Sequence, residues 1–156
     1  MGFAIPAAMA AKLAAPRRKV VALLGDAGFA MAGLELLTAV REKIPLTAIV
    51  FADGFDGLIR LKQLQEYGRA FGTDLANPDF GALAGSLGIG YALAKGNPEP
   101  ALAAAIASNG VTLVEVRLSI PTIGPRAREG AATGAAESVL GEEMLATIRR
   151  TIRKLR

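Results

Sequence analysis

The sequence of 156 residues contains no cysteine, no histidine and no tryptophan, and only 5% of its residues are aromatic. The absence of cysteine excludes disulfides and thiol nucleophiles, and the absence of both Cys and His excludes the usual zinc sites. Without histidine there is no His-centred acid–base relay. Oxygen ligands, which suit Mg²⁺ or Ca²⁺, remain available. Any catalysis by this chain therefore depends on a cofactor or on another chain.

The sequence also lacks a long apolar run and a large excess of charge. The N-terminal apolar stretch is broken by Pro6 and closed by Lys12, so it is shorter than the roughly 20 residues of a membrane span. Its basic residues follow the apolar stretch, whereas a signal peptide has them first. The net charge of +4 arises mostly near the two ends, and aromatic residues for base stacking are few. We expect a cytoplasmic protein that binds neither membranes nor nucleic acid.

Short apolar runs alternate with segments of helical periodicity in the first three quarters of the chain. The expected strands are 19–24, 46–51, 89–94 and 111–118, and the expected helices are 5–15, 33–43, 57–68, 79–87 and 98–108. The helix at 79–87 follows the start signal Asn77-Pro78-Asp79. Strands that alternate with helices of about ten residues imply an α/β fold, with a parallel sheet covered by helices on both faces.

The character of the sequence changes after Leu118. Residues 119–137 contain two prolines and many small residues, and they predict a linker. Residues 138–156 predict an amphipathic helix, because apolar side chains form one stripe and an Arg/Lys cluster lies at the C-terminal end. We expect this helix to pack on its own domain, with a partner helix and then a membrane surface as alternatives.

Two expected loops, each directly after a strand, carry carboxylates. Residues 25–29 follow the first expected strand and contain Asp26, and residues 52–57 follow the second and contain Asp53. In open α/β sheets, ligands bind where the carboxyl ends of the strands meet. Two carboxylates there would suit a Mg²⁺ ion that bridges protein and diphosphate. On spacing alone, the commoner alternative is that both aspartates are helix caps or turn formers.

These segments resemble the diphosphate motif of thiamine-diphosphate enzymes of the acetolactate synthase and pyruvate decarboxylase group. Gly25-Asp26-Ala27 is similar to the family's Gly-Asp-Gly, and Leu46–Gly57 is similar to the later segment with Asn-Asn or Asn-Asp. Met1–Ala8 and Glu35–Ala39 resemble the flanking segments in register. The resemblance covers residues 1–118. It implies the family's C-terminal, diphosphate-binding domain, without the strand that normally precedes Met1.

By this resemblance, the cofactor-binding residues are Met1, Gly25, Asp26, Ala27, Gly28, Asp53 and Phe55. The two carboxylates would bind Mg²⁺, with the backbone carbonyl of Phe55 as a further ligand. Ala27 and Gly28 would donate backbone N–H groups to the diphosphate. Met1 would support thiamine diphosphate in its bent shape.

The sequence departs from the family at Ala52, where asparagine is usual, and at Asp56, where a larger residue such as Tyr is common. Asp56 either weakens diphosphate binding through like-charge repulsion or adds a metal ligand. The family's pyrimidine-binding domain, whose glutamate activates the cofactor, has no counterpart in these 156 residues. We therefore expect a homo-oligomeric module that needs a pyrimidine-binding domain or subunit for catalysis. The alternative is a non-catalytic, self-associating remnant.

Other interpretations have less support from the residues. A magnesium-dependent phosphate-ester enzyme could use the same two aspartates, but no base or nucleophile accompanies them. Glu35 is a candidate acid, although helix glutamates usually face solvent. Gly88-Ile89-Gly90 lacks the spacing and the preceding strand of a dinucleotide fingerprint.

Overall fold

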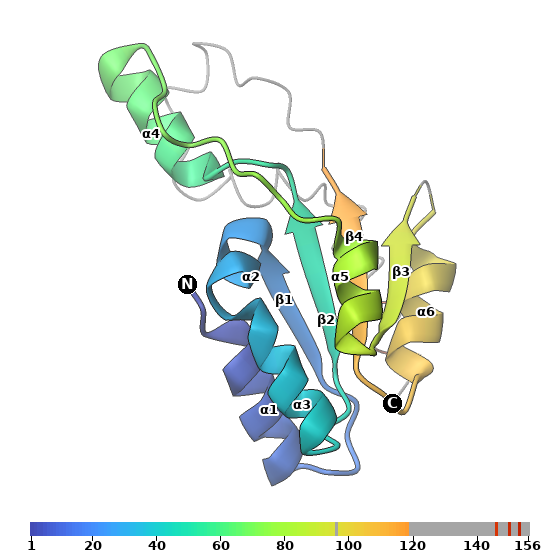
Figure 1. Ribbon diagram of the computed structural model, residues 1–156. Helices are drawn as coiled ribbons and strands as arrows, with labels where there is room; N and C mark the ends of the chain where they lie inside the picture. Colours follow the sequence, from blue (N-terminus) through green and yellow to red (C-terminus); the bar gives the residue numbers. More distant parts are fainter. Residues whose placement is uncertain (96, 119–145, 147–149, 151–152, 154–156) are drawn as a thin grey trace.

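A parallel sheet of four strands forms the centre of the computed structural model, which describes residues 1–95, 97–118, 146, 150 and 153. The strands are β1 (Val21–Gly25), β2 (Thr47–Ala52), β3 (Gly90–Ala94) and β4 (Thr112–Arg117). Their order in the sheet is β1-β2-β4-β3, and all three pairings are parallel. Their carboxyl ends therefore meet at one edge, at the top of Figure 1. The sheet confirms the predicted α/β class.

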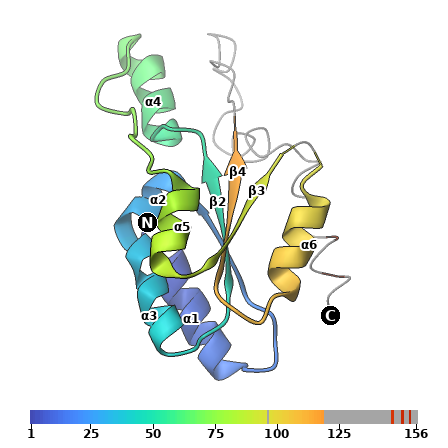
Figure 2. The same cartoon turned by 45° about the vertical axis from the view of Figure 1, so that its right-hand side comes forward.

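Helices cover both faces of the sheet. One face is covered by α1 (Ala4–Ala14), α2 (Asp26–Ala32), the 3₁₀ helix η1 (Gly33–Glu35), α3 (Leu36–Arg41) and α5 (Phe80–Leu87). The opposite face is covered by α6 (Glu99–Ala107), as Figure 2 shows. No helix within the described residues has the length and apolarity to cross a membrane. The predicted linker 119–137 lies outside the described residues, and so does the predicted helix 138–156 except at three positions.

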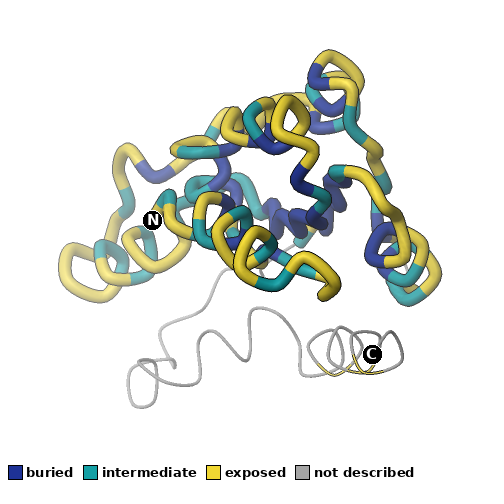
Figure 3. The backbone as a smooth tube through the Cα atoms, turned by 90° about the horizontal axis from the view of Figure 1, so that it is seen from below, coloured by how far each residue is buried: buried dark blue, intermediate teal, exposed yellow. Residues whose placement is uncertain are grey.

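Two apolar cores result from the alternation of side chains along the strands. Ala48 and Val50 of β2 belong to the core under α1, α3 and α5, whereas Ile49 and Phe51 belong to the core under α6. Every residue of β2 is buried, because β2 has neighbours on both sides and helices on both faces. Figure 3 shows this buried centre inside a ring of half-exposed helices.

The segment after β1 differs from the sequence prediction. Residues 25–29 are predicted as a loop before a helix at 33, but α2 begins directly at Asp26. Alanines at three of the seven positions favour the helix, and Phe29 anchors it by packing edge-on against Phe80 of α5, with ring centroids 5.3 Å apart. Gly33 follows this helix and begins η1, and the position favours glycine, because a Cβ there would stand 2.5 Å from the Phe29 ring.

One part of the chain leaves this layered body. We call residues 53–77 the arm; it consists of α4 (Gly57–Tyr67) and the extended segments before and after it. The helix α4 has no buried residue and projects away from the sheet beyond its carboxyl edge (Figure 1). The arm therefore stands directly over the edge where ligands of this fold class bind.

Candidate functional site at the carboxyl edge of the sheet

Asp26 is a buried carboxylate at the end of β1, with only 4% of its surface exposed. Its Oδ1 accepts a hydrogen bond from the N–H of Ala27 at 2.9 Å. Its Oδ2 accepts two, from the N–H of Gly54 at 2.9 Å and from Nδ2 of Asn77 at 2.7 Å. Asp26 is therefore held between α2 and both ends of the arm.

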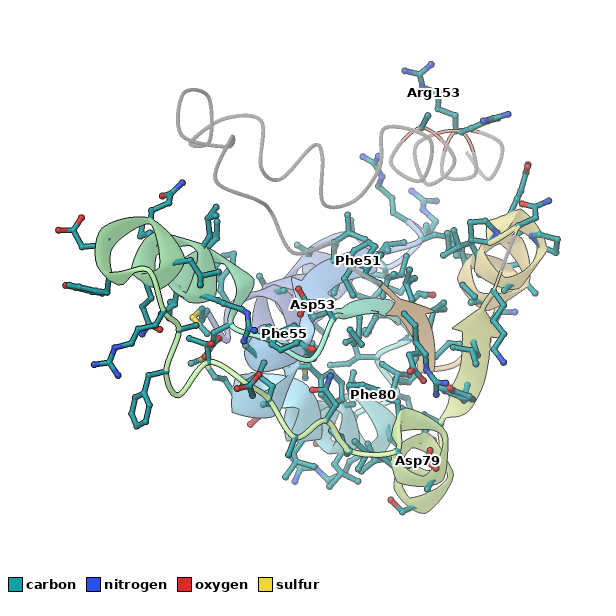
Figure 4. The ribbon with its side chains drawn as sticks, turned by 90° about the horizontal axis from the view of Figure 1, so that it is seen from above. Phe51, Asp53, Phe55, Asp79, Phe80 and Arg153 are labelled. Carbon is teal, nitrogen blue, oxygen red and sulfur yellow. The ribbon has the colours of Figure 1, made fainter. Side chains whose placement is uncertain are left out.

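Asp53 follows the neighbouring strand β2 and lies at the start of the arm. Figure 4 views this edge from above, with Asp53 and Phe55 between the end of the sheet and α4. Burial raises the pKa of the Asp53 carboxyl, and the charges of Asp26 and Asp56 raise it further, while a hydrogen bond from the Phe55 N–H lowers it. The structure thus brings the two predicted aspartates close enough to repel each other.

The alternative roles of Asp26 and Asp53 were helix N-cap and turn former, and the structure supports only the second, for Asp53. Neither is a helix N-cap: the N-cap of α2 is Gly25 and that of α4 is Asp56, and neither makes a side-chain capping bond. Asp53 does form a turn, because its Oδ1 accepts the N–H of Phe55 at 3.0 Å. Asp79 is a true cap, since its Oδ1 accepts the N–H of Ala82 at 2.9 Å at the start of α5.

The two ends of the arm pair with each other at its base. Asp56 donates its N–H to the carbonyl of Thr73 at 2.8 Å, and Leu75 donates its N–H to the carbonyl of Gly54 at 2.8 Å. Gly54 adopts φ +77°, a conformation that favours glycine. The short antiparallel bridge between these ends fixes where the arm leaves the body.

Arg60 adds a second set of contacts at the arm base. Its guanidinium lies 4.4 Å from the centroid of the Phe55 ring and donates to Asp74 at 3.1 Å. A longer contact of 3.4 Å reaches the hydroxyl of Thr73, which is 1% exposed. The Phe55 ring therefore makes a cation–π contact with Arg60 at the base of the arm.

A pocket of about 280 Å³ opens beside Asp26, between α2, η1 and the segment that returns from the arm. Apolar side chains make up most of its lining, and Asp26 and Asn77 contribute a carboxylate and an amide. The carboxyl edge thus combines charged groups with an adjacent, mostly apolar space. Such a combination is typical of small-molecule sites.

The remaining predicted residues lie at different places. The N–H of Ala27 already bonds to Asp26. Gly28 belongs to the first turn of α2, at the same edge. The chain start lies beside the C-terminal end of α2, where a Cβ on Gly2 would stand 3.6 Å from the Met31 side chain. The neighbouring Met1 is 76% exposed, and its role as a support for the cofactor stays a prediction.

Asn77 is a site residue that the sequence analysis missed. Asn77-Pro78-Asp79 predicts a helix start, and only Asp79 acts as the cap. The signal for Asn77 itself was absent, because its partner Asp26 lies 51 residues earlier in the chain. Only the pairing of the arm ends brings the amide to the carboxylate.

A second polar cluster lies in the body, between β3 and β4. Glu115 is 4% exposed; it accepts the Tyr91 hydroxyl and the Arg117 Nε, each at 2.5 Å. Burial and the contact with Glu115 raise the pKa of Tyr91 to about 12. These three groups satisfy one another, so the cluster joins the edge strand β3 to the sheet.

A known family model matches this chain over residues 1–116, and it is described as the C-terminal TPP-binding domain of thiamine pyrophosphate enzymes. The chain belongs to the thiamine pyrophosphate enzyme family. This confirms the resemblance that the sequence motifs indicate.

Individual members of the thiamine pyrophosphate enzyme family are similar to the chain over much of its length. An acetolactate synthase of Bacillus subtilis (strain 168) is 40% identical over 88 residues, which cover 56% of this chain and 15% of that protein. A catabolic acetolactate synthase of Raoultella terrigena is 34% identical over 118 residues, which cover 74% of this chain and 21% of that protein. The chain thus spans about a fifth or less of the length of these two relatives.

A solved structure of the thiamine pyrophosphate enzyme family shows the same fold. It is the thiamine diphosphate-dependent 4-hydroxybenzoylformate decarboxylase of Rhodococcus jostii RHA1. The two structures align with a TM-score of 0.70 at 31% identity, over 78% of this chain and 24% of that one. The four-stranded sheet and its helices are therefore those of a TPP-binding domain.

Proposed function

We propose that this domain holds the diphosphate of thiamine diphosphate through a divalent cation, as part of an acetolactate synthase-like 2-oxo acid decarboxylase or carboligase. The observation that carries the proposal is the placement of Asp26 and Asp53 at the carboxyl ends of adjacent strands. When bound, thiamine diphosphate supplies carbanion stabilisation. The contribution of this chain is to bind and orient the cofactor.

The donor chemistry of this edge fits Mg²⁺. No group of three or more carboxylates within the described residues could hold a metal unaided. Mg²⁺ that is shared with phosphates needs only one or two protein carboxylates, because phosphate oxygens and water complete its shell. The mutual repulsion of Asp26 and Asp53 is the charge arrangement that a divalent cation would relieve. The Phe55 carbonyl is the further oxygen ligand in this proposal.

The surface of the arm supports a role for a partner domain. Leu58, Tyr67 and Phe71 are 69%, 72% and 83% exposed, so large apolar side chains are open to solvent along the length of the arm. The arm that carries these side chains begins at the proposed cofactor site, directly after β2 (Figure 1). We propose that a pyrimidine-binding domain covers it and completes the pocket, and that the assembly is a homo-oligomer.

Calorimetric titration with thiamine diphosphate and Mg²⁺ tests the cofactor proposal. Wild-type protein is expected to bind, and Asp26→Ala and Asp53→Ala are each expected to reduce the affinity at least tenfold, because each removes a proposed cation ligand. Glu42→Ala is the matched control, since Glu42 is an exposed carboxylate that pairs with Arg41 before β2, at the other edge of the sheet. Undiminished binding by both aspartate variants would contradict the proposed site.

Asp56 favours a second candidate, a domain that keeps the fold without catalysis. Its charge adds to the repulsion at Asp53, and a buried Ala52 stands where the family usually has an amide. Turnover of a 2-oxo acid after addition of a pyrimidine-binding domain from an acetolactate synthase would exclude this candidate. Its absence, with cofactor binding intact, would support it.

A further inference from the structure

The hydrogen bonds of Asp26 are distributed unevenly between its two oxygens. An ionised carboxylate has about four lone-pair positions, two on each oxygen. The N–H of Gly54 and the amide of Asn77 fill both positions of Oδ2. The N–H of Ala27 fills one position of Oδ1, and no other group among the described residues donates to this oxygen, so its second lone pair is left for a ligand.

The two donors to Oδ2 come from opposite ends of the arm. Gly54 lies where the chain leaves β2, and Asn77 lies where it returns to α5. The same two ends are joined by the Leu75–Gly54 hydrogen bond. Asp26 thus closes the base of an arm whose helix has no buried residue of its own.

We propose that Asn77 is a positioning residue of the cation site, and that its hydrogen bond couples cation binding at Asp26 to closure of the arm base. The proposal rests on the proposed function. Asn77 holds Oδ2 and thereby presents Oδ1 as the single ligand atom of Asp26. A group that orients a metal-binding carboxylate typically contributes tenfold or more to metal affinity.

The coupling acts in both directions, because linked equilibria are reciprocal. A cation on Oδ1 fixes the carboxylate and so stabilises the hydrogen bonds from Gly54 and Asn77. Closure of the arm base, in turn, fixes the carboxylate for the cation. The exposed apolar side chains of the arm are then held in place most firmly when the cation is bound.

The first measurement is the binding of Mn²⁺ in the presence of thiamine diphosphate. The EPR signal of Mn²⁺ reports the bound fraction. Asn77→Ala and the nearly isosteric Asn77→Leu both lack the donor, and each is expected to weaken Mn²⁺ binding about tenfold. Asn109→Ala is the matched control, because Asn109 precedes β4 at the opposite edge of the sheet and bonds to Lys19. Far-UV circular dichroism verifies that each variant is folded. Equal or tighter binding by Asn77→Ala, or unchanged binding by Asn77→Leu, overturns the positioning role.

The second measurement is amide hydrogen exchange of Gly54, Asp56 and Leu75, which close the arm base. Without ligand, exchange is expected to be several-fold faster in Asn77→Ala than in wild type and in Asn109→Ala. Addition of Mn²⁺ and thiamine diphosphate should slow it in wild type and less in Asn77→Ala. Unchanged exchange in Asn77→Ala overturns the coupling. A wild-type protein that binds no Mn²⁺ overturns the proposed function instead, whatever the exchange rates are.

Discussion

The body of the molecule and its arm are held in place by different forces. In the body, every residue of β2 is buried and two apolar cores pack against the sheet. In the arm, α4 has no buried residue, and backbone hydrogen bonds, Arg60 and Asp26 fix its base. Global stability therefore resides in the body, whereas the placement of the arm depends on a few polar contacts beside the proposed cofactor.

The largest expected difference comes from removing the same side chain in each region. Leu36 of α3 is fully buried, so Leu36→Ala should lower the free energy of unfolding by about 2–5 kcal/mol. Leu58 of α4 is 69% exposed, so Leu58→Ala should change it by no more than about 0.5 kcal/mol. Urea unfolding of the two variants measures both values. A loss above about 2 kcal/mol for Leu58→Ala would show that the arm is part of the cooperative core.

A smaller effect is expected from two helical glycines of the body that have different surroundings. At Gly33 an added Cβ would clash with the buried Phe29 ring, so Gly33→Ala should destabilise the protein by about 1–3 kcal/mol. At Gly85 of α5 a Cβ would meet nothing within 4 Å, so Gly85→Ala should stabilise it by up to about 1 kcal/mol. Thermal unfolding distinguishes the two signs. Equal stability changes for Gly33→Ala and Gly85→Ala would mean that the Phe29 ring moves aside at little energetic cost.

At the junction of arm and body, the protein is expected to become more stable when the carboxylate of Asp53, a predicted metal ligand, is replaced by an amide. The pKa of Asp53 is raised in the folded protein, so the ionised form is disfavoured there. A raised carboxyl pKa contributes stability below its unfolded-state value, and this contribution is lost as the pH rises through the folded-state value. Asp53→Asn should therefore raise the melting temperature slightly at pH 7 without cofactor, and less at pH 3. A lower melting temperature at pH 7 would contradict this account.

The sequence predicted the body better than the arm. All four strands and the covering helices α1, α3, α5 and α6 were predicted, and the strands were recognisable because burial on both faces leaves near-continuous apolar runs such as Leu46 to Phe51. The start of α2 was missed, since Gly28 and an aspartate directly after β1 are also typical of loops. The extent of α4 was predicted closely, but its projection away from the body was not, because its exposed apolar residues resemble a core face.

For the site, spacing predicted the proximity of Asp26 and Asp53 but not the contacts of Asp26 with both ends of the arm. Parallel pairing of β1 and β2 places both carboxylates at one edge, and this follows from the fold class alone. The bond from Asn77 to Asp26 requires the arm to return over the same edge, and no local pattern encodes that path. Long-range polar contacts of this kind depend on tertiary structure.

The smallest predicted effect concerns polar contacts within the body rather than the arm. The Tyr91 hydroxyl bonds to the buried carboxylate of Glu115, and its ring packs beside Gly81. Burial and this contact raise the pKa of Tyr91 from 10.0 to about 12. Its contribution to stability is complete below pH 10.0 and is lost as the pH rises to about 12.

Phenolate absorbance near 295 nm measures this titration directly in the Tyr67→Phe variant, because Tyr91 is then the only tyrosine. The remaining phenol should titrate near 12, and adding Glu115→Gln should lower the midpoint, since the negative charge is gone. A midpoint at the ordinary value with Glu115 present would show that the hydroxyl is solvated. The polar cluster of the body would then be as accessible to solvent as the contacts at the arm base. In that case only the buried apolar cores would distinguish the body from the arm.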